Sequence, residues 1–419
     1  MQEISSNMLM EGLESGQYKY SQLYNLDLEL SQYHALRHYI ENDTDIITKS
    51  QLLNIMFFDI EVYTFNTGEF LPDKAKQPIS AITIYSTVEK VFHTYFLVLP
   101  QISRLVTAEY LHQFKIETKQ TLLDNKYILE DEDLHIYLFT DELKMIEACW
   151  KMIHEIDPAI LSGWNADTYD LPYIYTRLNN KYEDEKKVCK TLSKFGVVKK
   201  RKTDGRFILS IADYPLIDLL RLYKPRDDGG LAYGKKQASY SLDYVSDAEL
   251  HLKKISYKDE GMSLDKLYET DPYKYILYNI ADVALTVRLN QKLQHIELHN
   301  IIRRSMKASM SVSLRGQTGL FGSYYSFELE RMEQKFKWGI VPELTNSLDK
   351  FDIQEIPRPT EKATKWDVIK VDISDYQKIV NRYPGAYVKD CPGKIVTASD
   401  GLLIDLDATA LLVNSSFYQ

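Results

Sequence analysis

The stretch Ile55–Val62, IMFFDIEV, decides the fold expected of this chain. Its apolar residues predict a buried β-strand that carries two acids, Asp59 and Glu61. Strand side chains alternate between the two faces of a sheet, so acids two positions apart point to the same face. Two carboxylates on one side of an apolar strand are costly unless a positive charge lies between them. A divalent metal ion is the simplest explanation, and the alternative is an edge strand whose acids lie in water.

The surrounding sequence predicts a mixed α/β fold. Residues 1–50 are expected to be helical and polar, and the region near Pro357–Thr360 to be a linker-like break. The segment Gly401–Val413 is expected to form a strand and then a helix. The other elements expected are strands at 79–86, 90–99 and 159–163 and helices at 141–156 and 271–293.

The composition is that of an ordinary globular protein, with 44% hydrophobic and 26% charged residues among 419. This composition disfavours a disordered chain, and no apolar run approaches the roughly 18 residues of a membrane span. The first residues carry no positively charged segment ahead of an apolar core, so no signal peptide is expected. The three cysteines are too few and too scattered for a disulfide framework or a zinc knuckle. A reducing compartment, the cytoplasm, is therefore expected.

The charge is distributed unevenly along the chain. The net charge of −9 argues against a nucleic-acid-binding protein, but net charge does not describe where the charges lie. The stretch Lys186–Arg206 holds nine Lys or Arg residues against one acid, Asp204. Within it, VVKKRKTDGRFILSI alternates around Thr203-Asp204-Gly205, and Asp-Gly between two strand-like runs predicts a β-hairpin. Because charged runs are more often solvated faces, the charge alone leaves the function of this stretch open.

Two further acids stand at positions that suit metal ligands. Asp170 follows a Gly163-Trp164-Asn165 turn and precedes Leu171-Pro172, a pattern typical of a helix start, so taken alone it fits an N-cap as well as a ligand. Asp282 lies four residues after Tyr278 on a predicted helix, so the two side chains share a face. With the strand pair, these acids suit two Mg²⁺ ions, which prefer oxygen ligands. Such ions can activate a water for attack on a phosphodiester, and Tyr278 could orient that water.

Three segments carry a specific resemblance to a known family. These are FFDIEVYT around Asp59, LSGWNADTYDLPYIYTRL around Asp170, and YNIAD, which ends at Asp282. They resemble the exonuclease motifs of the proofreading domain of family B DNA polymerases, in particular those of T-even-type bacteriophages. The flanking segments SYSLDYVS and GEFLPDKAKQPISAITIYS are also similar to the family, and the resemblance covers residues 52–300. It implies a ribonuclease H-like domain of the tyrosine-type DEDD class, with a mixed central sheet flanked by helices.

The resemblance also implies roles for individual residues. Tyr278 would position the attacking water, and Asn165 takes the position near the DNA terminus. The basic hairpin falls where the family has a β-hairpin that helps to part the primer from the template. Two Mg²⁺ ions, with Mn²⁺ as a substitute, would be held by Asp59, Glu61, Asp170 and Asp282. DNA-binding side chains are expected at Asn165, Lys199, Lys200, Arg201, Lys202 and Arg206.

The partners that the resemblance implies are a single-stranded DNA 3′ end and primer–template DNA. No membrane is expected as a partner. A phage-encoded chain of this kind would act in the cytoplasm of the host. A sliding clamp is a further partner that the family suggests, although no segment matches a clamp-binding peptide.

A second likeness lies near the C-terminal end of the sequence. YPGAYVKDCPGKIV is similar to the loop before the family's first polymerase motif, and LLIDLDATALLVNSS resembles that motif itself. The register places Asp407 at the polymerase-site metal ligand, but Leu412 stands where the family has a tyrosine under the nucleotide sugar. The fingers motif is missing, and so is the Asp-Thr-Asp of the palm. Asp43-Thr44-Asp45 precedes the exonuclease motifs and is interpreted as a chance match.

These likenesses predict four regions: a short N-terminal segment at 1–50, an exonuclease domain at 51–310, a connecting, N-terminal-domain-like region at 311–380, and the start of a palm at 381–419. The leading hypothesis is a Mg²⁺-dependent 3′→5′ DNA exonuclease that forms the N-terminal part of a split or truncated family B polymerase. A second hypothesis is a binding subunit, completed as a polymerase by a second polypeptide that carries the fingers and the remaining palm. A third is a DEDD nuclease that acts on RNA.

Overall fold

The described residues of the computed structural model fall into two compact units. Asn42–Ser323 forms one compact unit, and the remaining described residues belong to the other. The predicted metal ligand Asp407, the elements expected at 401–413 and Asp43-Thr44-Asp45 lie outside the described residues. The described residues are 30–42, 53–203, 206–226, 230–256, 262–336, 356–359 and 366–369.

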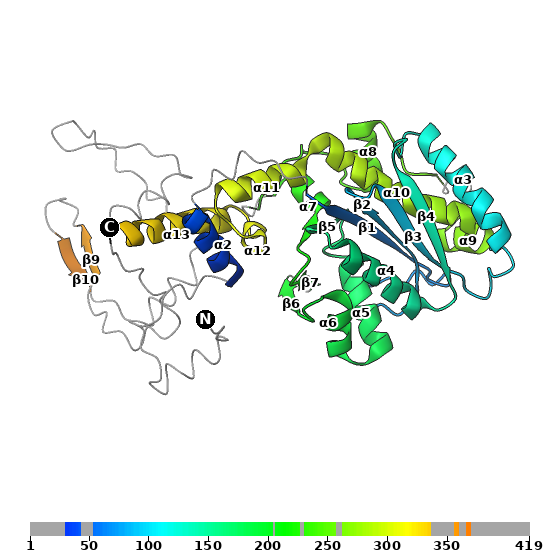
Figure 1. The fold of residues 1–419 in the computed structure, drawn as a ribbon, viewed down its shortest axis with the longest axis horizontal. Coiled ribbons are helices and arrows are strands. Elements are labelled where there is room, and N and C mark those ends of the chain that lie inside the picture. The colour runs from blue at the N-terminus through cyan, green and yellow to red at the C-terminus, as the bar shows by residue number, and fades with distance from the viewer. Residues whose placement is uncertain are drawn as a thin grey trace. The chain divides into compact units, whose positions relative to one another are not determined.

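A six-stranded mixed sheet forms the centre of the Asn42–Ser323 unit (Figure 1). The strand β1 is an interior strand of this sheet: it pairs antiparallel with β2 over residues 56–62 and parallel with β5 over residues 55–57. The edge-strand alternative for Asp59 and Glu61 is therefore wrong. The order of the strands across the sheet is β4 (Asp133–Phe139), β3 (Val91–Leu97), β2 (Ile79–Ser86), β1 (Ile55–Val62), β5 (Ile160–Gly163) and β8 (Leu216–Asp218).

Helices cover both faces of this sheet, as Figure 1 shows. Alternate β1 residues serve two hydrophobic cores, with Ile55 and Phe57 in the first and Met56 and Phe58 in the second. By the same alternation, Asp59 and Glu61 lie on the face of the first core. That core includes α3 (Ala108–Asp124), α8 (Leu242–Leu250), α9 (Leu264–Thr270) and α10 (Pro272–Leu293). The second core includes α4 (Glu142–Ile156), α5 (Asp170–Tyr182) and α6 (Glu185–Leu192).

The two long helices predicted from the sequence begin at capping aspartates. The Asp141 side chain accepts a hydrogen bond from the backbone of Lys144 ahead of α4, and the Asp271 side chain accepts one from Lys274 ahead of α10. Pro272 then occupies the first turn of α10, where a missing N–H costs no helical hydrogen bond.

The other described helices are shorter or lie toward the end of the described chain. They are α2 (Leu30–Asn42), α7 (Leu219–Tyr223), α11 (His295–Ser305), α12 (Met310–Ser313) and α13 (Gln317–Phe336). Among the described residues, no helix combines the length and the hydrophobicity that crossing a membrane requires.

Two small antiparallel pairs lie outside the main sheet. The predicted hairpin is confirmed, with β6 (Val198–Thr203) paired to β7 (Arg206–Ile211). The second pair joins β9 (Ile356–Pro359) to β10 (Trp366–Ile369). The linker-like break expected near Pro357–Thr360 is therefore wrong over the residues of β9. A strand in a two-stranded pair has one open side, where the missing N–H of a proline costs no ladder hydrogen bond.

Candidate functional site

Three carboxylates converge beside the central strand. Asp59 and Glu61 come from β1 and Asp282 from α10, and one oxygen of each lies within 4.8 Å of the others. The Asn279 side chain donates to Asp59 Oδ2 at 2.9 Å, which orients that carboxylate. Asp282 Oδ1 is buried and has no hydrogen-bond partner among the described residues. A cluster of oxygen ligands with one buried oxygen left open fits a hard divalent cation such as Mg²⁺.

Asp170, the first residue of α5, lies next to this cluster but is not one of the three acids whose oxygens converge within 4.8 Å. Its Oδ1 accepts a hydrogen bond from the backbone N–H of Ile60, the residue between the two β1 acids, at 3.1 Å. The N-cap of α5 is Tyr169, whose side chain makes no capping bond, so the N-cap alternative for Asp170 is wrong. Burial, and then the charge of Asp170, raise the pKa of Asp59 well above its usual range. The fourth predicted acid thus lies beside the other three.

The crowding of these acids changes their protonation. Burial, and then the charge of Asp282, raise the pKa of Glu61 to about 8. Burial raises the pKa of Asp170 to about 7, although the hydrogen bond from Ile60 opposes this. Burial also raises the pKa of Asp282. Near neutral pH the cluster therefore holds protons that a bound cation would displace, and such perturbed groups are typical of functional sites.

Lys254, which the sequence analysis did not single out, brings positive charge to the cluster. Its Nζ donates to Asp282 Oδ2 at 2.5 Å and to the Tyr278 hydroxyl at 3.2 Å. Burial lowers the pKa of Lys254, but the cluster's carboxylates, Asp282 first, raise it above its usual value, so the side chain stays charged. Its neighbour Lys253 is exposed on the surface. Nothing in the local sequence HLKKIS distinguishes the two lysines.

The turn that carries Asn165 is held by a buried aspartate. Asn165 has a left-handed φ of 70°. Its backbone N–H donates to Asp218 Oδ1, and that of Asp167 donates to Asp218 Oδ2, both at 3.1 Å. Asp218 is buried at the end of β8, the strand beside β5. This carboxylate fixes the turn that leads into Asp170, and the sequence does not reveal the contact because the two segments lie far apart in the chain.

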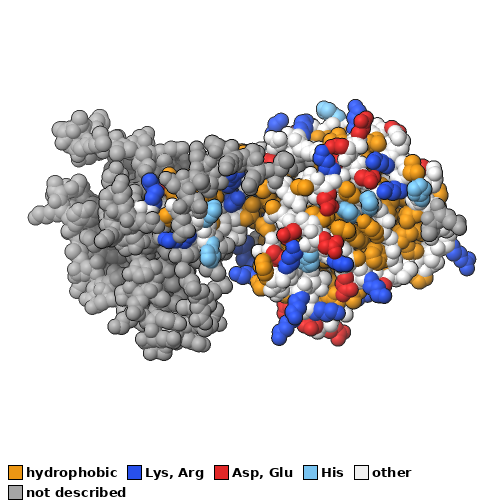
Figure 2. Space-filling model, in the orientation of Figure 1, with side chains coloured by type: hydrophobic (Ala, Val, Ile, Leu, Met, Phe, Trp, Pro, Cys, Tyr) orange, Lys and Arg blue, Asp and Glu red, His pale blue; other side chains and the backbone are white. Residues whose placement is uncertain are grey.

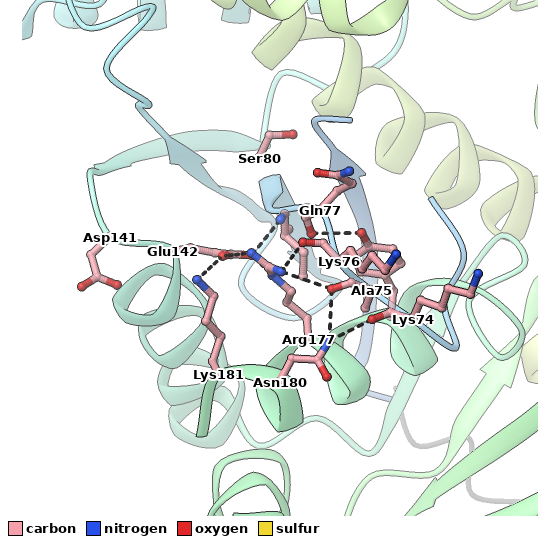
Figure 3. A network of polar contacts seen from close by, with 12 residues as sticks. Lys74, Ala75, Lys76, Gln77, Ser80, Asp141, Glu142, Arg177, Asn180 and Lys181 are labelled. Atoms are coloured by element: carbon pink, nitrogen blue, oxygen red, sulfur yellow. Dashed lines mark hydrogen bonds and ion pairs between the residues drawn. The ribbon is translucent and has the colours of Figure 1, made fainter. Parts of the chain in front are cut away.

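A buried ion pair anchors the loop between β1 and β2 (Figure 3). Arg177 of α5 donates from Nε and Nη2 to the two carboxylate oxygens of Glu142, each at 2.7 Å. Its Nη1 donates to the backbone oxygens of Ala75 and Lys76. Glu142 Oε1 also accepts from the backbone N–H of Ile79, where β2 begins. The network therefore fixes the end of the loop that leads into β2, the strand that pairs with the site strand β1.

The hairpin carries exposed cations, and one of them packs against the protein. Lys200 Nζ lies 4.1 Å from the ring centroid of Phe207 and 5.5 Å from that of Tyr175 on α5. Lys199 and Arg201 are also exposed. In the described part of the chain, the cation that contacts the carboxylate cluster is Lys254, not a hairpin residue. The side chains of Lys202 and Arg206 lie outside what the structure describes.

Comparison with known proteins gives consistent matches. The family model for the exonuclease domain of DNA polymerase family B matches residues 18–245, which include Asp59, Glu61 and Asp170 but not Asp282. The DNA-directed DNA polymerase of Escherichia phage RB69 is 29% identical over 259 residues, 60% of this chain and 26% of that polymerase. That of Enterobacteria phage T4 is 28% identical over 283 residues, 64% of this chain and 29% of that polymerase. The chain therefore spans less than a third of the length of these two relatives.

Proposed function

Since the chain belongs to the family B DNA polymerases through their exonuclease domain, we propose that it is a proofreading nuclease that removes nucleotides from DNA 3′ ends. The observation that carries this proposal is the convergence of Asp59, Glu61 and Asp282 within 4.8 Å, with Asp170 beside them. A six-stranded mixed sheet with helices on both faces also agrees with a ribonuclease H-like DEDD domain. The order and spacing of the three motifs support the same assignment.

The acids would serve as metal ligands. When bound, two Mg²⁺ ions, or Mn²⁺ in their place, supply the activation of the attacking water and the stabilisation of the departing oxygen. Asp282 Oδ1 suits this role because it is buried and has no hydrogen-bond partner among the described residues. The backbone bond to Asp170 Oδ1 and the Asn279 bond to Asp59 keep two of the ligands in place before any cation arrives. The ligand set is Asp59, Glu61, Asp170 and Asp282.

The other polar side chains would position the reactants. The Tyr278 hydroxyl, held by Lys254, would orient the attacking water. The ammonium of Lys254 would offset the added negative charge of the DNA phosphate. Asn165 would contact the terminal nucleotide from its rigid turn. Hydrolysis would break the bond between phosphorus and the 3′ oxygen, which leaves with a proton, and would release a deoxynucleoside 5′-monophosphate.

Removal of the β1 acids tests this function. The double substitution Asp59→Ala and Glu61→Ala should abolish degradation of a 3′-labelled DNA strand, because two ligands are lost together. The double variant should still bind the same strand in EDTA, as measured by fluorescence anisotropy. The matched control is Asp247→Ala, which removes a surface acid paired with Lys253 and should leave the nuclease activity unchanged.

Two outcomes would overturn the assignment. Undiminished degradation by the double variant would exclude these acids from the reaction. Faster degradation of an RNA strand than of a DNA strand of the same sequence would favour a DEDD nuclease that acts on RNA.

We also propose that polymerase activity needs regions of the relatives that lie outside the match. A second polypeptide with the fingers and the remaining palm would supply them, Asp407 would contribute to the polymerase metal site, and a sliding clamp would be a further partner. The two phage relatives are DNA-directed DNA polymerases, and the match covers 26% and 29% of their lengths. Primer–template DNA would then be a substrate of the assembly, in the cytoplasm of a host.

A further inference from the structure

A pocket of 590 Å³ opens beside α6, and none of the carboxylate-cluster residues lines it. It lies between α6 and the start of the hairpin strand β6. Figure 2 shows basic side chains interleaved with acidic ones along the lower edge of this unit, where Figure 1 places α5 and α6. The residues of the lining that matter below are Glu185, Lys186, Cys189, Lys190, Lys194 and Phe195.

The charge of this α6 pocket is positive. Lys186 and Lys190 stand four positions apart on α6, so they share a face of the helix, and both are exposed. The structure gives neither of them an ionic partner among the described residues, whereas Lys194 pairs with Asp157 at 2.6 Å. Glu185, the acid of the lining, accepts a hydrogen bond from the Tyr175 hydroxyl. The two unpaired ammonium groups therefore favour an anionic ligand.

An aromatic ring stands at the same pocket. Phe195 is 73% exposed, which is more than any other large hydrophobic side chain in the described residues. The turn that presents it is fixed by the Gly196 N–H, which donates to the Ser193 oxygen at 2.9 Å, and by the left-handed φ of Gly196, 65°. A planar ring held in water beside two cations is the combination with which proteins bind unpaired bases and their phosphates.

We propose that the α6 pocket is a second binding site for single-stranded DNA, apart from the carboxylate cluster. Lys186 and Lys190 bind backbone phosphates, and Phe195 stacks on one base. A duplex fits less well, because its paired bases do not offer their faces to a ring. The identification of the ligand as DNA rests on the proposed function. The chemistry of the pocket by itself favours an anionic chain with flat, exposed rings.

The first experiment measures the binding of a fluorescent 16-nucleotide DNA strand to the full chain in EDTA over a range of salt concentrations. The double variant Lys186→Ala/Lys190→Ala should lower the slope of log affinity against log salt by about 1.4, from roughly 0.7 per phosphate contact. The charge-matched control Lys115→Ala/Lys126→Ala removes one lysine of α3 and one just after its end. Since α3 packs on the other face of the sheet from α6, this control should change the slope far less. Equal slopes for the two double variants would overturn the proposal.

The second experiment tests the stacking. Phe195→Ala should weaken binding of the same strand roughly tenfold, and Phe195→Trp should restore it, because stacking needs a ring and not merely an apolar side chain. Phe195→Leu should behave like Phe195→Ala. Affinity that is insensitive to all three changes, or that is restored by leucine, would overturn the assignment of Phe195.

Cys189 offers a direct readout in the unaltered protein. It lines the pocket, so bound DNA should slow its alkylation by N-ethylmaleimide, measured by mass spectrometry of the Cys189 peptide. An acidic peptide of equal charge should protect it less, and equal protection would favour a protein partner instead. Failure of this inference would leave the nuclease activity intact, whereas failure of the proposed function would appear as absence of that activity in the unaltered chain.

Discussion

At the scale of single residues, the buried acids link the stability of the folded chain to pH. In an unfolded chain, aspartate and glutamate have pKa values near about 4. In the folded chain, burial raises the pKa of Asp170 to about 7 and that of Glu61 to about 8. Between the unfolded pKa values and these raised folded values, the folded state binds more protons than the unfolded state. The free energy of unfolding therefore falls as the pH rises through this range.

We therefore expect the metal-free protein to lose stability progressively as the pH rises from about 5 to about 8, where the folded state gives up its extra protons. In EDTA the midpoint of thermal unfolding should fall over this range, and Mg²⁺ should narrow the difference because it replaces the protons. Glu61→Gln should make the dependence shallower, since an amide does not titrate. Thermal unfolding followed by circular dichroism measures the effect, and the same midpoint at both pH values in EDTA would contradict it.

At the scale of elements, the pair of Arg177 and Glu142 joins α5 and α4 to the loop after the site strand. Arg177→Ala would leave the Glu142 carboxylate, which is 7% exposed, without its bidentate partner. It would also remove the donor to the backbone oxygens of Ala75 and Lys76. Removal of one partner of a buried pair costs about 3–5 kcal/mol. We expect a loss of that size in the free energy of unfolding, measured with urea.

Lys181 provides the matched control for this prediction. It also pairs with Glu142, at 3.1 Å, but its side chain is 38% exposed. Because water screens an exposed pair, Lys181→Ala should cost at most about 1 kcal/mol. Equal losses for the two variants would mean that the buried geometry of Arg177 has no special effect.

The hairpin supports a prediction in which its lysines differ. Lys199→Ala, Arg201→Ala and Lys202→Ala together should weaken single-stranded DNA binding and lower its salt slope by about 2. Lys200→Ala should lower the slope by less than the roughly 0.7 expected of one phosphate contact, because this side chain packs over Phe207 and Tyr175. Binding measured across salt concentrations distinguishes the two. A slope unchanged in the triple variant would count against a DNA contact here.

At the scale of the whole molecule, the chain covers 26% and 29% of the two phage polymerases. We expect the isolated chain to degrade DNA but to incorporate nucleotides poorly, because the remaining palm and fingers motifs do not occur in this sequence. A primer-extension assay, with and without a candidate second polypeptide, measures both activities. Robust polymerisation by the chain alone would contradict this division of labour.

The parts of the fold that follow from local pattern could be predicted from the sequence. The alternation in β1 placed Asp59 and Glu61 on one face, and Asp204-Gly205 predicted the β6–β7 hairpin. The break near Pro357 was wrong because β9 depends on pairing with β10, and a pairing partner leaves no mark on the segment itself. The N-cap alternative for Asp170 could be decided only by its bond to Ile60, which belongs to another element.

By itself the sequence singled out Asp59, Glu61, Asp170 and Asp282 as candidate ligands and placed the two acids of β1 on one face, because alternation along a strand sets the face of each side chain. Only the tertiary structure decided which groups from other segments offset the charge of these acids and hold the neighbouring turn. Lys254 meets Asp282 from a loop after α8, and Asp218 holds the turn of Asn165 from another strand. Both contacts join segments far apart in the chain, and the attraction between buried opposite charges depends on distance in space, which the linear sequence does not record.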